Sequence, residues 1–514
     1  MAQAGEETVA TAASASELAT TQDAGEFSFL KERFSVLKDS FKPRTERARI
    51  EVEGAITTLV NEALADSTVI KADVLDTIEE MIARIDQKLT AQMNEILHAP
   101  EFQQLESAWR GLHYFVLNSE TDAMLKIKFL NVSKKELGRN LRTSYPGAKW
   151  DQSPLFKAIY ENEFGILGGQ PYGCLIGDFE FTHLPTDVQL LRDISKIAGA
   201  AHAPFFSAAS PTLMGMDSWT ELGNPRDLSK LFDTVEYAGW KGLREQTDSR
   251  YVGLCMPRVL ARLPYGAKTE PVEEFAFEEE TDAHAGTKYA WMNAAYAMGV
   301  NINRAFKENG WCTRIRGVES GGEVINLPSH TFPTDDGGVD LKCPTEIAIS
   351  DRREHELAKS GLIPIIHRKN TDKAAFIGAQ SVFKPRSFSG PKGVEATASD
   401  NLSARLPYMF AVCRFAHYLK VMIRDKVGSY REAPQLTRWL TEWINEYVDG
   451  DPINSSELDK ARKPLAAAAI EIVPLEENPG YYSAKFFLRP HFQLEGMDVG
   501  LSLVSKVPEN MLAK

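Results

Sequence analysis

Two carboxylates and two serines fall at the ends of two apolar runs and could together form a polar cleft. Asp178 and Glu180 follow the run YGCLIG, and Ser207 and Ser210 fall near the end of the run PFFSAA. Ligands of open parallel sheets bind beyond the carboxyl ends of the strands, so these side chains could support acid–base or nucleophilic chemistry. The alternative, which we favour, is that the carboxylates cap turns or pair with arginines. The candidate arginines are Arg192, Arg250 and Arg258.

A second charged group surrounds the apolar run Tyr251–Met256, which we predict to be a buried strand. Arg250, Arg258 and Arg262 lie at and just beyond its ends, and Asp248 precedes it. Arginine pairs in buried or interfacial positions fix geometry more than they add stability. We therefore predict that Asp248 and the three arginines form structural ion pairs, within the chain or between chains, and do not bind substrate.

No motif of a catalytic class is present in the sequence. The glycine-rich LGGQPYG precedes a predicted strand, whereas a phosphate-binding loop must follow a strand and open a helix. The ten histidines form no HExxH and no pair at metal-ligand spacing, and there is no GxSxG. The five cysteines are scattered without a CxxC, as expected for reduced cysteines of a cytoplasmic protein. We predict no catalytic residue, no cofactor and no bound metal.

Composition limits the partners and the compartment. The chain has 514 residues, which suggests two to four domains, and a net charge of −13. A strongly negative field disfavours nucleic acid and anionic membranes as main partners. The sequence contains no apolar run long enough for a transmembrane helix and no secretory signal, so we expect no membrane insertion.

The order of predicted elements indicates an α/β fold, α+β overall. The pattern is helical from residue 49 to 118, with one apolar stripe from Leu75 to Ile96, and strands then alternate with helices, starting at LKIKF (125–129). We divide the chain into a disordered or extended segment (1–45), a helical region (46–120), an α/β core (121–390) and a C-terminal domain that includes strands (391–514).

The C-terminal domain begins with a predicted helix, residues 401–427, whose first turn could instead begin at Pro407. This helix is basic in an otherwise acidic chain. Its cations are Arg405, Arg414, Lys420, Arg424 and Lys426. A basic helix could contact an acidic partner, or it could be a solvated face whose charges suit the helix dipole. The pattern does not distinguish these two interpretations.

The last part of the chain has the pattern of strands. A terminal strand with a free edge can pair with another chain, although a closed intramolecular sheet fits the same pattern. The candidate strand residues are Tyr481, Tyr482, Ala484, Phe486, Leu488, Leu501 and Leu503.

Four long stretches resemble a known family. They are ILHAPEFQQLESAWRGLHYFV, GDFEFTHLPTDVQLLRDISKIAGAAHAPFFSAASP, WKGLREQTDSRYVGLCMPRVLARLPYG and FFLRPHFQLEGMDVGLSLVSKVP. From about residue 50 to the C-terminus, the chain is similar to the large subunit of the type VI secretion contractile sheath, called TssC or VipB. The first 45 or so residues carry none of the resemblance.

The resemblance implies a structural protein of the bacterial cytoplasm with a phage-tail-sheath-like core. Such subunits pair with a small sheath subunit (TssB or VipA), and the heterodimers polymerise on a baseplate around an inner tube of Hcp. Neighbouring protomers share strands, the sheath contracts, and the AAA+ ATPase ClpV disassembles it. On this resemblance the 46–120 region would pair with the small subunit, and the basic helix would face the tube.

Two competing functions remain open from the sequence. One is a cytoplasmic α/β enzyme with its site near Asp178 and Glu180, which a bound small molecule or metal there would favour. The other is a regulatory scaffold that binds one partner without polymerising, which a heterodimer that never forms tubes would favour.

Overall fold

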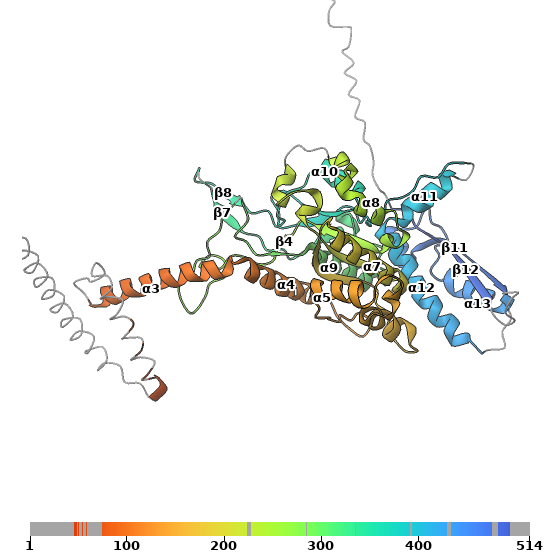
Figure 1. The fold of residues 1–514 in the computed structure, drawn as a ribbon, viewed down its shortest axis with the longest axis horizontal. Coiled ribbons are helices and arrows are strands. Elements are labelled where there is room, and N and C mark those ends of the chain that lie inside the picture. Colours follow the sequence, from red (N-terminus) through yellow and green to blue (C-terminus); the bar gives the residue numbers. More distant parts are fainter. Residues whose placement is uncertain are drawn as a thin grey trace, which may run out of the picture. The chain divides into compact units, whose positions relative to one another are not determined.

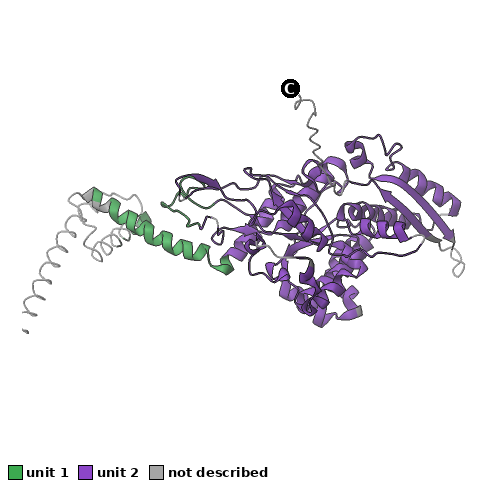
Figure 2. Cartoon of the chain, turned by 90° about the horizontal axis from the view of Figure 1, so that it is seen from above, with its two compact units in different colours: residues 1–102, 264–281 green, residues 103–263, 282–514 purple. Residues whose placement is uncertain are grey.

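The computed structural model describes most of the chain and divides it into two compact units. The described residues are 74–223, 228–283, 285–334, 336–390, 393–428, 433–474 and 482–493, with a few helical residues between 46 and 58. Unit 1 comprises residues 1–102 and 264–281, and unit 2 comprises residues 103–263 and 282–514 (Figure 2). The predicted disordered segment 1–45 lies outside the described residues, as do Tyr481, Leu501 and Leu503.

Unit 1 is built around helix α3 (Val74–Leu97), whose C-terminal half holds the segment 264–281. The Asn94 carboxamide donates to the carbonyl oxygen of Glu278 at 3.3 Å and accepts from the amide of Glu280 at 2.8 Å. His98 lies 3.7 Å from the carboxylate of Glu279. These polar contacts fix an acidic segment that has no strand or helix of its own.

A six-stranded sheet forms the centre of unit 2, in the order β1-β2-β3-β9-β10-β6. The first four of these strands are parallel, and β10 is antiparallel to both of its neighbours. Three two-stranded sheets accompany it. The strands are β1 Leu175–Phe181, β2 Phe205–Ala209, β3 Val252–Met256, β4 Val259–Leu260, β5 Trp291–Met292, β6 Glu323–Val324, β7 Thr331–Pro333, β8 Val339–Leu341, β9 Ile363–His367, β10 Ala374–Phe376, β11 Leu465–Pro474 and β12 Tyr482–Pro490.

Helices cover both faces of the central sheet (Figure 1). The helices after α3 are α4 Pro100–Leu117, α5 Lys134–Arg139, α6 Pro154–Phe156, α7 Pro185–Ala201, α8 Ala238–Arg244, α9 Ala294–Asn309, α10 Asp351–Lys359, α11 Gly393–Ser403, α12 Leu406–Lys426, α13 Ala433–Asn445 and α14 Glu457–Arg462. Short 3₁₀ and π turns occupy Asn140–Ser144, Gly147–Gln152, Lys157–Gly165, Pro211–Met214, Trp219–Gly223, Leu228–Asp233, Val235–Tyr237, Thr247–Tyr251 and Val318–Gly322.

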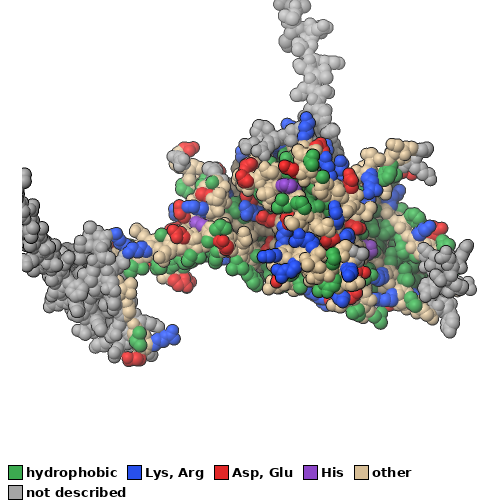
Figure 3. All heavy atoms as spheres, in the orientation of Figure 1, with side chains coloured by type: hydrophobic (Ala, Val, Ile, Leu, Met, Phe, Trp, Pro, Cys, Tyr) green, Lys and Arg blue, Asp and Glu red, His purple; other side chains and the backbone are tan. Residues whose placement is uncertain are grey.

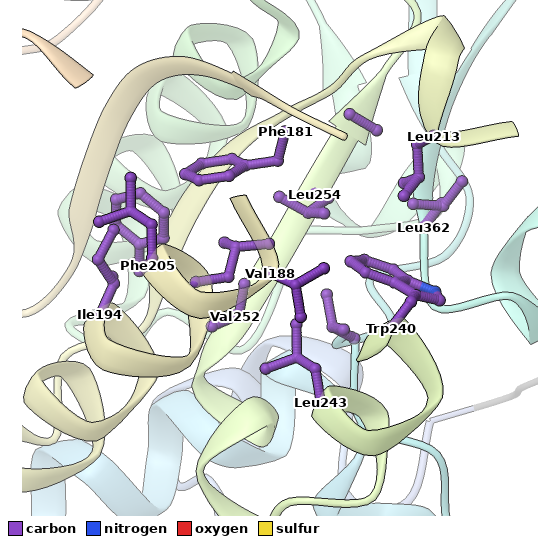
Figure 4. Packing of buried hydrophobic residues seen from close by; sticks show 14 of the residues in the cluster. Phe181, Val188, Ile194, Phe205, Leu213, Trp240, Leu243, Val252, Leu254 and Leu362 are labelled. Carbon is purple, nitrogen blue, oxygen red and sulfur yellow. The ribbon is translucent and has the colours of Figure 1, made fainter. Parts of the chain in front are cut away.

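Alternation along the strands distributes their side chains between two cores. Phe205 and Leu254 pack against α7 and α8 in the first core (Figure 4), whereas the next residues, Phe206 and Cys255, pack in a second core with α9. Successive side chains of a strand point to opposite faces, so continuous apolar runs are buried on both faces. Such runs are typical of the centre of a helix-covered parallel sheet, and the predicted α/β fold class is confirmed.

The C-terminal part of unit 2 forms a third core. α13 packs against β11, and Trp311, from the chain after α9, stacks on Phe415 of α12 with ring centroids 4.5 Å apart. α12 starts in the second core, with Leu406 and Phe410, and continues into the third with Phe415 and Leu419. One helix therefore belongs to both the central sheet and the C-terminal part.

Three sequence predictions differ from the structure. LKIKF is not a strand, because it lies in an extended segment with no partner strand among the described residues. The helix predicted over 401–427 is α12, which begins at Leu406 in agreement with the alternative first turn at Pro407, and residues 401–403 instead end the separate helix α11. β1 continues to Phe181, so Asp178 and Glu180 lie within the strand and not beyond its end.

Candidate functional site

The carboxylates of β1 lie on the outermost strand of the central sheet, where polar side chains can remain partly solvated. Asp178 accepts a hydrogen bond from the Asn293 carboxamide at 3.3 Å. Desolvation by the surrounding protein raises the pKa of Asp178 and of Glu180, and for Glu180 the nearby Arg258 opposes this effect. The two carboxylates are held by protein partners.

The structure does not bring the serines into an open cleft with these carboxylates. Ser207 is fully buried in β2, and its hydroxyl lies 2.8 Å from the carbonyl oxygen of Gly177 and 2.7 Å from that of Phe179. These bonds support the irregular register between β1 and β2. The Ser210 hydroxyl lies 3.0 Å from that of Thr212. A buried hydroxyl bonded to backbone carbonyls braces the strands and is not placed to attack a substrate.

Arg258 follows β3 and forms a bidentate pair with Glu346. Its Nε lies 3.0 Å from Glu346 Oε2, and its Nη2 lies 2.8 Å from Oε1. Two parallel charge-assisted bonds define the orientation of both groups. The pair joins the end of β3 to a segment 88 residues later in the chain.

Arg250 and Arg262 also pair with distant carboxylates. Arg250 bonds to Asp400, and its guanidinium lies 4.4 Å from the centre of the Phe383 ring. Arg262 pairs with Glu106 of α4, with Nε 2.5 Å from Oε1 and Nη2 3.2 Å from Oε2. The three arginines around β3 thus connect it to three separate parts of unit 2.

Asp248 behaves differently from the arginines with which it was predicted to pair. Its carboxylate lies beside Gly199, near the end of α7, and it forms no ion pair within the described part of the chain. The arginines instead use Asp400, Glu346 and Glu106. No local sequence signal marks these carboxylates, because they are remote in sequence from β3.

Two cations of α12 are engaged with aromatic rings of the same chain. The Arg414 guanidinium lies 4.6 Å from the ring centre of Tyr418. The Lys420 ammonium lies 3.6 Å from the ring centre of Phe164 and donates to the Tyr160 hydroxyl at 2.9 Å. Cation–π contacts of this kind are favourable where water is partly excluded.

The other cations of the basic helix also have contacts within the chain. Arg424 donates to the carbonyl oxygen of Ile166 at 3.1 Å, and the Lys426 ammonium lies 5.1 Å from the Trp439 ring centre. Arg405 is the N-cap residue of α12 and is half-buried. The positive charges of α12 therefore hold neighbouring parts of unit 2 together, and the placement of this helix against an inner tube stays a prediction.

The hairpin β11–β12 has one packed face and one exposed face. Ile470 and Ile472 of β11 pack with Phe486 and Leu488 of β12 in the third core. On the other face Phe487 is 59% exposed. Apart from one bridge between Val448 and Leu465, no further strand pairs with the hairpin in the described part of the chain. Tyr482 and Ala484 lie in this paired strand β12.

Exposed apolar side chains run along α4 and along α3. On α4, Leu105 is 56%, Trp109 60% and Val116 44% exposed, although Tyr114 and Phe115 of the same helix are buried. On α3, Ile82, Leu89 and Ile96 are exposed at intervals of seven residues; Figure 3 shows hydrophobic side chains at the surface of this helix. Sequence reasoning found the stripe of α3 but missed that α4 is apolar on two faces.

A metal-binding cluster and a membrane-spanning helix are both absent from the described residues. Within them, no group of three or more histidine, cysteine or acidic side chains is placed to hold a metal ion. No described helix is both long and apolar enough to cross a membrane.

Comparison with known proteins places these features in the class of tail sheath proteins. A model of the EvpB/VC_A0108 tail sheath N-terminal domain matches residues 79–383, and a model of the EvpB/VC_A0108 tail sheath gpW/gp25-like domain matches residues 395–507. The helix-covered sheet falls in the first match and the hairpin β11–β12 in the second.

Two individual proteins are similar to this chain, at very different levels of identity. The chain is 63% identical over 489 residues to the type VI secretion system sheath protein TssC1 of Pseudomonas aeruginosa, covering 95% of this chain and 96% of that protein. A chain in the cryo-EM structure of the anti-feeding prophage baseplate is similar at 8% identity and a TM-score of 0.34, over 62% of this chain and 66% of that one, which is too distant to support an argument. The chain belongs to the VipB (TssC) family of type VI secretion sheath large subunits.

Proposed function

We propose that this chain is a structural, non-enzymatic subunit that pairs with a small sheath subunit (TssB or VipA) and polymerises with it around an Hcp inner tube. Contraction of the polymer would then propel the tube. Family membership supports the sheath role, and the observation that carries the polymerisation is the hairpin β11–β12. Its outer edges present backbone groups that no other strand pairs within the described residues.

Unpaired strand edges support a link between protomers. A two-stranded hairpin is marginally stable alone, and an added strand from another chain satisfies its free N–H and C=O groups. The α12–α13 layer covers one face of the hairpin. Apart from the bridge between Val448 and Leu465, neither edge of the hairpin is paired with a further strand among the described residues. We propose that the C-terminal domain, residues 391–514, is the tube-facing part in which strands are exchanged, including the candidate residues Tyr481, Leu501 and Leu503.

The exposed apolar stripes support a helical partner for residues 46–120. Trp109 is a large aromatic side chain at 60% exposure, and aromatic anchors dominate the energetics of many interfaces. We assign this surface to the small subunit, and residues 121–390 to the sheath core. The finer roles follow the family: assembly on a baseplate in the bacterial cytoplasm, and disassembly by a ClpV-type ATPase that supplies the ATP hydrolysis.

Co-expression followed by negative-stain electron microscopy tests the proposal. The full chain with the neighbouring small sheath subunit should give hollow, ridged tubes, whereas the chain alone should not. A heterodimer that never forms tubes would support the regulatory scaffold, and a monomer without tubes in either preparation would refute the sheath role.

A further inference from the structure

A basic extended segment beside β1 has no strand to pair with. Residues 124–135, which we call the lysine segment, contain four lysines and no acidic residue. Residues 126–132 form no helix or strand, and none of their backbone groups is hydrogen-bonded to another backbone group within the described part of the chain. The sequence LKIKF within this segment alternates as a strand does, so a strand supplied by another chain would complete it.

Contacts of some of its side chains hold the lysine segment in this extended form. Ile127 packs against the second core and Val132 against the first. Lys128 pairs with Glu163, and its ammonium lies 5.4 Å from the ring centre of Tyr172, shortly before β1. A segment that is already ordered loses little conformational entropy when a partner strand binds to it.

Other side chains of the lysine segment face solvent. Met124 is 74% exposed, Phe129 64% and Leu130 59%. Lys126 is exposed and donates to the Gln170 carboxamide oxygen at 3.0 Å, and it forms no ion pair among the described residues. Exposed apolar side chains next to a cation without a carboxylate partner are typical of a surface that another protein covers.

Unit 1 contains an extended segment of the opposite charge. Five of the eight residues 273–280, which we call the glutamate segment, are glutamates. Phe277 and Glu279 are buried, and the amide of Tyr265 donates to the Glu279 carboxylate at 2.9 Å. Glu273 and Glu274 are exposed and form no ion pair in the described part of the chain. The glutamate segment is thus fixed on one side and offers free carboxylates on the other.

Charge makes a second copy of this chain the partner that fits both segments. The chain has a net charge of −13, so its copies repel one another overall. Contact between copies is therefore favoured where a positive segment of one chain meets a negative segment of the next. A contact between two different surfaces of identical chains is head-to-tail, and it continues into an open helical polymer when it does not close into a ring.

We propose that the glutamate segment of one chain binds to the lysine segment of the next chain as an added strand, with its carboxylates facing Lys126 and Lys128. Opposite charges directly across two paired strands are favourable, and like charges are unfavourable. The contact rests on the polymerisation under Proposed function. It adds a second junction between copies, separate from the hairpin β11–β12 and from the exposed stripes assigned to the small subunit.

Charge reversal in trans tests the proposal with the full chain and the small sheath subunit. One variant, Lys126→Glu with Lys128→Gln, places a negative charge in the lysine segment and keeps a donor for Glu163. The other variant is Glu273→Lys with Glu274→Lys. Each variant alone should give several-fold less sedimentable tube than the native chain, because like charges then meet at every junction. Co-expression of both variants should restore the tubes, because alternating chains again join opposite charges.

A matched control and gel filtration separate this contact from other effects of charge. Arg368→Gln with Lys369→Glu makes the same change of charge at two exposed residues between β9 and β10, and it should leave the tube yield unchanged. Each variant should still elute as a heterodimer with the small subunit.

The possible outcomes distinguish failure of this contact from failure of the proposed function. A native tube yield from either variant alone would overturn the contact and leave the sheath role intact. Loss of the heterodimer, or loss of tubes that co-expression does not restore, would also overturn it, because the segments would then act within one chain or on another partner. Absence of tubes from the native chain would refute the polymerisation itself.

Discussion

The pair between Arg262 and Glu106 is the most buried of the three around β3. The Arg262 side chain is 3% exposed and that of Glu106 10%. Removing one member of a buried pair leaves a charge without compensation, which typically costs about 3–5 kcal/mol. Arg262→Ala should therefore lower the free energy of unfolding by about 3 kcal/mol, at the lower end because Arg110 stays 3.5 Å from Glu106. Urea denaturation measures the change.

A double variant and an exposed pair serve as controls for this prediction. Arg262→Met with Glu106→Leu removes both charges and should recover most of the lost stability. Arg438 and Glu442 form a pair with side chains 82% and 63% exposed, so Arg438→Ala should leave the free energy of unfolding almost unchanged. A double variant no more stable than Arg262→Ala would contradict the explanation by an unpaired charge.

His417 makes the stability of the chain depend on pH. It is buried on α12, its Nε2 donates to the Ala201 carbonyl at 2.8 Å, and burial lowers its pKa to about 4. Arg414, His202 and Lys420 contribute to this lowering of the pKa, and the bond to the Ala201 carbonyl opposes it. The unfolded chain therefore takes up the proton first as the pH falls. The contribution of His417 is fully present above about pH 6.5 and is lost towards pH 4, by up to about 3 kcal/mol.

Denaturation at a series of pH values measures the contribution of His417. His417→Gln keeps a donor for the Ala201 carbonyl but cannot titrate, so the slope of stability between pH 6.5 and 4 should decrease. Some slope should remain, since burial also lowers the pKa of His202. His355→Gln, at an exposed histidine, is the matched control and should leave the slope unchanged. An unchanged slope in the His417 variant would disprove the assignment.

Residue types near β3 were predictable from the sequence, but their partners were not. The arginines stand out beside an apolar run, yet their carboxylates lie 150, 88 and 156 residues away. Only the topology of the sheet brings such pairs together, and spacing along the chain carries no information about it.

At the scale of elements, glycines allow α4 and α9 to pack closely. A Cβ atom on Gly111 of α4 would lie 2.5 Å from the Tyr296 ring of α9, and one on Gly299 of α9 would lie 2.8 Å from Phe115 of α4 and 2.3 Å from Ile176. Gly299→Ala should destabilise the chain by about 1–3 kcal/mol, because overpacking outweighs the better helix propensity of alanine.

Thermal or urea unfolding measures the effect of Gly299→Ala. Gly173→Ala is its control, because a Cβ there meets nothing within 4 Å. If both variants unfold alike, the close approach of α4 and α9 does not depend on glycine.

The two faces of β12 give a separate test of assembly. Phe486 packs in the third core and Phe487 faces outward. Phe487→Ser should leave the stability of the chain unchanged and reduce tube formation with the small subunit, because the exposed face would contact neighbouring protomers. Phe486→Ser should lower stability itself. Comparable tube yields for Phe487→Ser and the native chain would argue against a contact at this face.

Strands and helices were predicted well where the spacing of apolar residues along the sequence agrees with the burial of those residues in the structure. Tyr251–Met256 and Pro204–Ala209 match β3 and β2 closely, because continuous apolar runs between turn residues identify central strands. LKIKF alternates as a strand should but has no strand to pair with. A pattern of apolar residues indicates which face of a segment could be buried. Whether the segment pairs with a neighbouring strand depends on elements elsewhere in the chain.

At the scale of the molecule, the C-terminal part should not separate from the rest of unit 2. Gln493 bonds to Arg316 at 2.8 Å and to the Thr313 carbonyl at 2.9 Å, and Trp311 stacks on Phe415. If a protease site is inserted between residues 384 and 392 and cleaved, the two fragments should still co-elute in gel filtration. Separate elution under native conditions would contradict a shared core.

The contacts that the α12 cations make within the chain limit how the proposed placement of α12 against the tube can be tested. If α12 faces the tube, reversal of Arg414, Lys420 and Arg424 to Glu should weaken association with the tube. Those cations contact Tyr418, Tyr160 and the Ile166 carbonyl, so the reversal should also destabilise the chain. Unfolding of the variant has to be measured before its sedimentation with the tube is interpreted.

The position of α12 in two cores has a mechanical consequence. The helix is 21 residues long, and its beginning packs under the central sheet while its middle packs under the hairpin. A force applied to the hairpin is therefore transmitted directly to the sheet by α12, a continuous helix with no hinge along its length. If hairpins join neighbouring chains, unit 2 of each chain carries load as a rigid block, and the compliance of a contracting filament has to reside outside these blocks.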